Sequence, residues 1–90
     1  MFKEIRVISL DQIRTHSAES SDKKYDIYFE LSNVPPPDWR NILQKDSGKY
    51  WIDGRHVVAQ GFSSQIEEIL SEVRKEVTRT NQKYREQLQK

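Results

Sequence analysis

The chain has 90 residues, of which 34% are apolar and 32% are charged, and its formal net charge is +1. This length predicts one small domain over residues 1–90, and the near-neutral charge gives no global attraction to nucleic acid or to anionic lipid. The absence of cysteine excludes disulfides, thiolate catalysis and thiolate metal sites. No apolar run is long enough to cross a membrane, and the first ten residues show no signal-peptide pattern. We therefore expect a cytoplasmic protein.

Two strands joined by a polar loop are predicted in the first third of the chain. The first strand covers Lys3–Ser9, and its alternation blurs at Ile8 and Leu10, which indicates a bulge or partial cover on both faces. Residues 15–24 are nearly all polar and predict the loop. The second strand covers Tyr25–Ser32, where alternation predicts one buried and one solvent-facing side. Its buried set would be Tyr25, Ile27, Phe29 and Leu31.

Three consecutive prolines, Pro35–Pro37, precede a short predicted helix. Proline suits the first turn of a helix because its missing N–H would be unpaired there. We expect the helix to run from Pro36 to Lys45 and to end at residues 46–48. The alternative of a polyproline II ligand lacks the P-x-x-P spacing. The core-facing residues of the helix would be Trp39, Ile42 and Leu43.

A β-hairpin is predicted over residues 50–60, about Asp53-Gly54, a dipeptide typical of a type I′ turn. Such a turn would pair Ile52 with Arg55 and Trp51 with His56. We expect the face that carries Tyr50, Ile52, Val57 and Ala59 to be buried. The opposite face would carry Trp51, His56 and Val58.

The last third of the chain predicts one long amphipathic helix over residues 64–88. Ser64 and Glu67 have the spacing of a capping box, so the helix should begin near Ser64. Its length would be about 37 Å, more than the diameter of about 30 Å for a compact chain of this size. We expect residues 79–90 to protrude or fray, or Tyr84 and Leu88 to pack against a second copy or a partner.

The predicted order is β-β-α-β-β-α, which indicates an α+β fold. The expected architecture is a four-stranded, mostly antiparallel sheet with the short helix and the long C-terminal helix packed on one face. The order of the strands in the sheet does not follow from the sequence.

Enzymatic activity is not expected from this sequence. The only histidines available as general bases are His16 and His56, one in the polar loop and one beside the hairpin turn. The sequence contains no H-E-x-x-H spacing and no phosphate-binding glycine loop. We therefore predict no catalytic, cofactor-binding or metal-binding residues and no cofactor.

A small protein–protein interaction domain, adaptor or regulatory, is the function that the sequence favours. Tyr28 and Trp51 would project from the open face of the sheet, and these residue types dominate interface hot spots. On the long helix, Tyr84 and Leu88 continue the apolar stripe after a polar gap, and Asn81 in that gap could set the register of a helix pair. The domain could therefore self-associate through its C-terminal helix.

The alternative is a weak nucleic-acid-binding protein that uses the basic end of the long helix. Arg79, Lys83 and Arg85 would contact phosphates in this case. Two observations count against it. Asp26 and Glu30 flank Tyr28 on the open face, and the isoelectric point of 8.0 lies below the value above about 9 that is typical of such domains.

Overall fold

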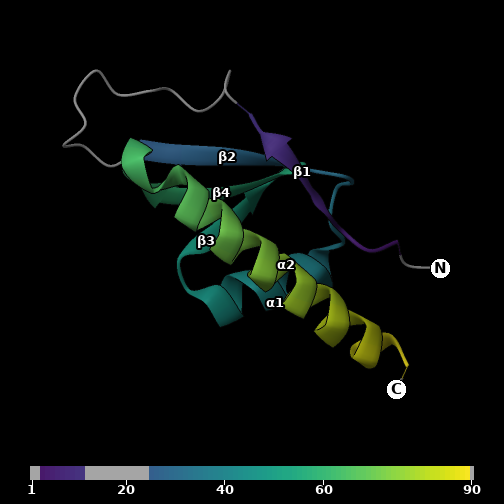
Figure 1. Ribbon diagram of the computed structural model, residues 1–90. Coiled ribbons are helices and arrows are strands. Elements are labelled where there is room, and N and C mark those ends of the chain that lie inside the picture. The colour runs from purple at the N-terminus through teal and green to yellow at the C-terminus, as the bar shows by residue number, and fades with distance from the viewer. Residues whose placement is uncertain (1–2, 12–24, 90) are drawn as a thin grey trace.

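Two helices pack against a four-stranded antiparallel sheet (Figure 1). The structure is a computed structural model that describes residues 3–11 and 25–89; the predicted polar loop, with His16, lies outside these ranges. The predicted element order, α+β class and antiparallel sheet are confirmed, and the strand order is β1-β2-β4-β3. The elements are β1 (Val7–Leu10), β2 (Tyr25–Leu31), α1 (Pro37–Ser47), β3 (Tyr50–Asp53), β4 (His56–Gly61), a 3-10 turn (Ser63–Gln65) and α2 (Ile66–Leu88).

The core lies between the helices and one face of the sheet. Alternation in β2 places Ile27, Phe29 and Leu31 on this face, where all three are fully buried. The helices contribute mainly Trp39 and Leu43 from α1 and Val73 and Val77 from α2, whereas Ile42 is only partly buried. The hairpin contributes Tyr50, Ile52, Val57 and Ala59, as predicted.

The first strand is shorter than predicted and contains the bulge that its sequence indicates. Val7 pairs with Leu31 and Ser9 pairs with Glu30, so Ile8 is the extra residue, and it is 53% exposed. The predicted strand began at Lys3, which is wrong. The ladder stops because the backbone N–H and C=O of Ile5 bond to a side chain of α2 instead of to a strand.

The hairpin turn lies one residue later than predicted. Ile52 pairs with Val57 and Asp53 with His56, so the two turn residues are Gly54 and Arg55. Gly54 has a φ of 59° and the φ of Arg55 is not positive, which fits a type II′ turn with glycine at its first central position. A type I′ turn at Asp53-Gly54 would have required a positive φ at Asp53 as well.

The short helix continues two residues further than predicted, to Ser47. It ends at Gly48, whose φ of 67° is left-handed and whose N–H donates to the Gln44 carbonyl at 3.2 Å. The end of α1 also holds the outer edge of β3. The N–H of Tyr50 donates to Ser47 Oγ at 3.2 Å, and the N–H of Ile52 donates to Gln44 Oε1 at 3.0 Å.

The long helix starts after a 3-10 turn, so the predicted capping box at Ser64 is wrong. Instead, Gln65 Oε1 accepts from the N–H of Phe62 at 3.3 Å, which is the same three-residue spacing displaced toward the N-terminus. The first turn of α2 packs closely against the end of β4, since a side chain at Gly61 would collide with Ile69.

The C-terminal turns of α2 remain helical as far as Leu88 and extend past the sheet (Figure 1). The molecule measures 48 × 21 × 18 Å along its principal axes, and α2 alone spans about 34 Å. No helix in the described part of the chain is long and apolar enough to span a membrane.

Candidate protein-interaction surface

The face of the sheet opposite the helices, here called the outer face, carries a row of three apolar side chains across three strands. In the register of the sheet, Val58 of β4 lies between Tyr28 of β2 and Trp51 of β3. Side chains paired in this way have Cβ atoms about 4.5 to 5.5 Å apart. Val58 is fully buried, and Trp51 is 36% exposed. We call Tyr28, Val58 and Trp51 the aromatic row.

Polar pairs border the aromatic row. Arg55 donates to Glu30 at 2.6 Å, and the side-chain amide of Gln60 donates to Asp26 at 3.3 Å. His56 Nε2 donates to Asp11 Oδ2 at 2.8 Å, and its ring meets the Tyr28 ring edge-on at 6.0 Å between centroids. An apolar centre with a hydrogen-bonded polar border is the arrangement found in protein–protein interfaces.

A cleft of about 810 Å³ opens beside Trp51, at the start of β3, and we call it the β3 cleft. Its walls come from three places in the chain: the end of α1, the two hairpin strands and the first turns of α2. The lining residues that matter below are Lys49, Tyr50, Trp51, Glu68, Ile69 and Glu72.

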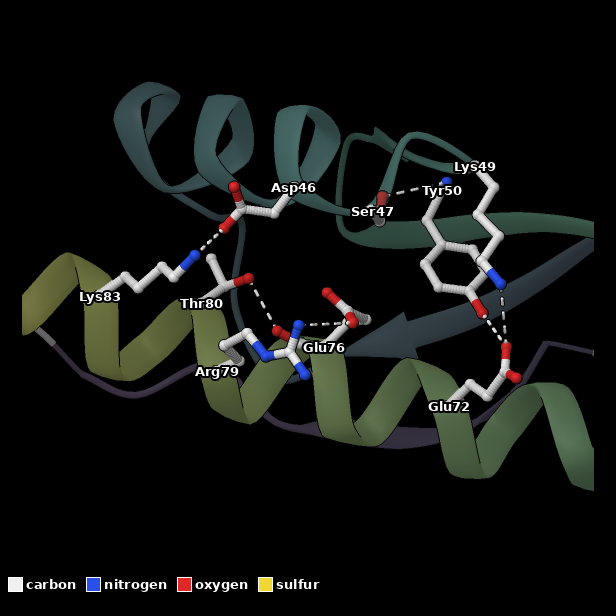
Figure 2. A network of polar contacts seen from close by, with 9 residues as sticks. All are labelled: Asp46, Ser47, Lys49, Tyr50, Glu72, Glu76, Arg79, Thr80 and Lys83. Atoms are coloured by element: carbon white, nitrogen blue, oxygen red, sulfur yellow. Dashed lines mark hydrogen bonds and ion pairs between the residues drawn. The ribbon is translucent and has the colours of Figure 1, made fainter.

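One carboxylate organises the polar side of this cleft (Figure 2). The Tyr50 hydroxyl donates to Glu72 Oε2 at 2.7 Å, and Lys49 Nζ lies 3.4 Å from the same oxygen. Burial and the hydrogen bond to Glu72 raise the pKa of Tyr50. The Tyr50 hydrogen bond, followed by the charge of Lys49, lowers the pKa of the Glu72 carboxyl. Glu72 is therefore an anion at neutral pH.

Asn81 lies in the interior, where it is 6% exposed. Its Oδ1 accepts from the backbone N–H of Ile5 at 3.0 Å and from the indole N–H of Trp39 at 2.9 Å, and its Nδ2 donates to the Ile5 carbonyl at 2.8 Å. Asn81 was predicted to set the register of a helix pair. Its contacts within the chain explain why a polar residue is buried in the apolar stripe, and they need no second helix.

The other two helix candidates lie apart from the aromatic row. Tyr84 is partly buried and packs against the core, whereas Leu88, one turn later, is 55% exposed. The structure therefore separates the predicted interaction residues, since Asn81 and Tyr84 pack in or against the core and the other three lie in two places. Tyr28 and Trp51 share the outer face, and Leu88 lies at the far end of α2.

Each of the three predicted nucleic-acid residues pairs with a carboxylate of this chain. Arg79 lies 3.4 Å from Glu76, and Lys83 lies 2.5 Å from Asp46 (Figure 2). Arg85 lies 2.8 Å from Glu4 of the N-terminal segment. Each carboxylate partly neutralises the basic side chain that would have to contact a phosphate.

Within residues 3–11 and 25–89, no three His, Cys, Asp or Glu side chains are grouped so that they could hold a metal ion. The sequence interpretation missed the β3 cleft, because Tyr50 and Glu72 lie 22 residues apart and meet only in the folded chain. Alternation did indicate that Val58 faces outward, but not that it would be buried. Comparisons with protein-family models, with curated proteins and with solved structures find no match.

Proposed function

We propose that this chain is a small, non-enzymatic protein-interaction domain that binds a partner on the outer face of its sheet. The observation that carries the proposal is the exposed indole of Trp51 at the end of the aromatic row. Tryptophan and tyrosine are the residues most enriched at interface hot spots, which gather in an apolar centre inside a polar border. The aromatic row and the polar pairs that border it have this composition. We place this activity in the cytoplasm, as expected from the sequence.

The test compares wild-type protein with Trp51→Ala in capture from the lysate of its host, followed by affinity measurement with the purified partner. We expect Trp51→Ala to weaken the partner about 30-fold or more, as loss of a hot spot does. Val34→Ala is the matched control, because Val34 is 66% exposed but lies in the loop before α1.

Three results would contradict the proposal. Equal affinity of the Trp51→Ala and wild-type proteins for the partner would show that the aromatic row is not part of the interface. Equal losses in the two variants would show a nonspecific effect. Recovery of nucleic acid that salt releases would instead support the alternative function of Arg79, Lys83 and Arg85.

Self-association through α2 is a second candidate, favoured by one observation. α2 remains helical to Leu88 and extends past the sheet, and Leu88 on its apolar stripe is 55% exposed. A second copy could cover this end of the helix. The candidate predicts a homodimer whose formation depends on Leu88.

A further inference from the structure

The β3 cleft already holds one cation, supplied by the chain itself. Lys49 Nζ lies 3.4 Å from Glu72 Oε2 and 5.7 Å from the centroid of the Tyr50 ring. A carboxylate beside an aromatic ring is a standard environment for an ammonium or guanidinium group. The Lys49 side chain is 66% exposed, so solvent screening keeps this internal pair weak and it can be displaced.

The cleft can accommodate more than the Lys49 ammonium. Glu68 lines it one helical turn before Glu72, and Lys49 is the basic residue that lines the cleft with them. Lys75 of α2 lies outside the lining but also acts on the Glu72 carboxylate. Ile69 and the Tyr50 ring add apolar surface against which the aliphatic part of a lysine or arginine could lie, and Trp51 lines the cleft at the edge strand. The cleft is open to solvent, and its volume of about 810 Å³ leaves room for a second long side chain beside Lys49.

We propose that the β3 cleft binds a lysine or arginine side chain of a protein partner, and that Lys49 occupies this place until the partner displaces it. This inference rests on the proposed function, because Trp51 belongs to both the aromatic row and the β3 cleft. The partner would lay an apolar side chain on Trp51 and insert the neighbouring basic side chain between Glu68 and Glu72. An acidic segment would meet the same two carboxylates and be repelled.

Peptide titration of the full chain tests the proposal. The probes are three peptides of alternating glycine and serine with a central Leu-Arg, Leu-Gln or Leu-Glu pair. Binding is followed by NMR through the indole N–H of Trp51 and the backbone N–H groups of Ile69 and Glu72. The indole of Trp39, which donates to Asn81, provides an internal reference away from the cleft. We expect the Leu-Arg peptide alone to shift the cleft signals.

Charge variants separate a local site from a general electrostatic effect. Lys49→Gln should tighten binding of the Leu-Arg peptide about two- to fivefold, and Glu72→Gln should weaken it by a similar factor. Lys45→Gln is the matched control, because it removes the same charge from α1 at a residue that does not line the β3 cleft. It should leave the affinity unchanged.

Equal binding of the Leu-Gln peptide would overturn the inference, and so would equal tightening by Lys49→Gln and Lys45→Gln. The inference would also be overturned if the Leu-Arg peptide bound neither the wild-type protein nor the Lys49→Gln variant. In that case, capture of a partner that still depends on Trp51 would leave the proposed docking face standing. If the Leu-Arg peptide does not bind and capture of a partner does not depend on Trp51, both the cleft proposal and the proposed function are contradicted.

Discussion

At the scale of single residues, Asn81 has the largest structural role of the predicted site residues. Its side-chain amide bonds to both backbone groups of Ile5 and to the Trp39 indole, and so joins the N-terminal segment, α1 and α2. The polar gap in the helix stripe indicated that Asn81 was unusual. It could not indicate the partners, because these come from positions 42 and 76 residues away in the sequence.

Replacement of Asn81 by alanine should destabilise the fold by about 3 kcal/mol or more. The variant leaves three buried polar groups without their present partner, and each such group costs about 1–3 kcal/mol. Urea denaturation gives the change as a lower midpoint at constant slope. Gln82→Ala, at the exposed neighbouring residue, should change the stability by less than about 0.5 kcal/mol. A similarly small effect of Asn81→Ala would show that water replaces the amide.

The Tyr50 hydroxyl should make the fold sensitive to alkaline pH. Its pKa is raised in the folded protein by burial and by the hydrogen bond to Glu72, whereas in the unfolded chain it ionises near its usual value of about 10. The stabilisation is therefore complete below about pH 10 and is lost as the pH rises further. The free energy of unfolding should decrease between about pH 8 and about pH 11, and this decrease should be larger for the wild-type protein than for Tyr50→Phe. Parallel curves would contradict this account.

At the scale of elements, the sequence patterns predicted the four strands and two α-helices of residues 3–11 and 25–89, but not all of their ends and not the 3-10 turn Ser63–Gln65. The hairpin shows why the predicted faces were nevertheless correct. Ile52 pairs with Val57 and not with Arg55, and a displacement of two residues returns each side chain to the same face. The choice between the two turns depends on φ at Asp53, which a type I′ turn at Asp53-Gly54 requires to be positive and which is not positive here.

The start of α2 shows the same limit. The predicted capping box of Ser64 and Glu67 does not start the helix, whose N-cap is Gln65. The N–H of Phe62 instead donates to Gln65 Oε1. Gly61 packs closely against the end of the Ile69 side chain, and this contact is visible only in the fold.

At the scale of the molecule, the outward direction of Tyr28 and Trp51 followed from alternation, whereas the β3 cleft did not. The cleft brings Lys49 and Tyr50, at the start of β3, against Glu68 and Glu72 of α2. Such a meeting depends on how the helix crosses the sheet. Local sequence patterns carry no information about that crossing.

If α2 mediates self-association, the molar mass in solution should depend on Leu88. Light scattering of wild-type protein at high concentration should then give a mass approaching twice 10.7 kDa, and Leu88→Ser should return it to the monomer value. Tyr84 is unsuitable for this test because it packs against the core. Ile8→Ser is the matched control, because Ile8 is 53% exposed on β1. A wild-type monomer, or a Leu88→Ser dimer, would contradict self-association through this helix end.

The side chains of Ser47 and Gln44 along β3 also limit how another chain can attach. An edge strand with unpaired N–H groups is a template on which a foreign strand can grow, and this is a common route to aggregation. In this protein, the N–H groups of Tyr50 and Ile52 are already donated to α1. A partner at this edge therefore cannot extend the sheet by accepting those hydrogen bonds and has to be recognised through side chains. The same two contacts leave fewer free N–H groups along β3 for edge-to-edge pairing of two copies.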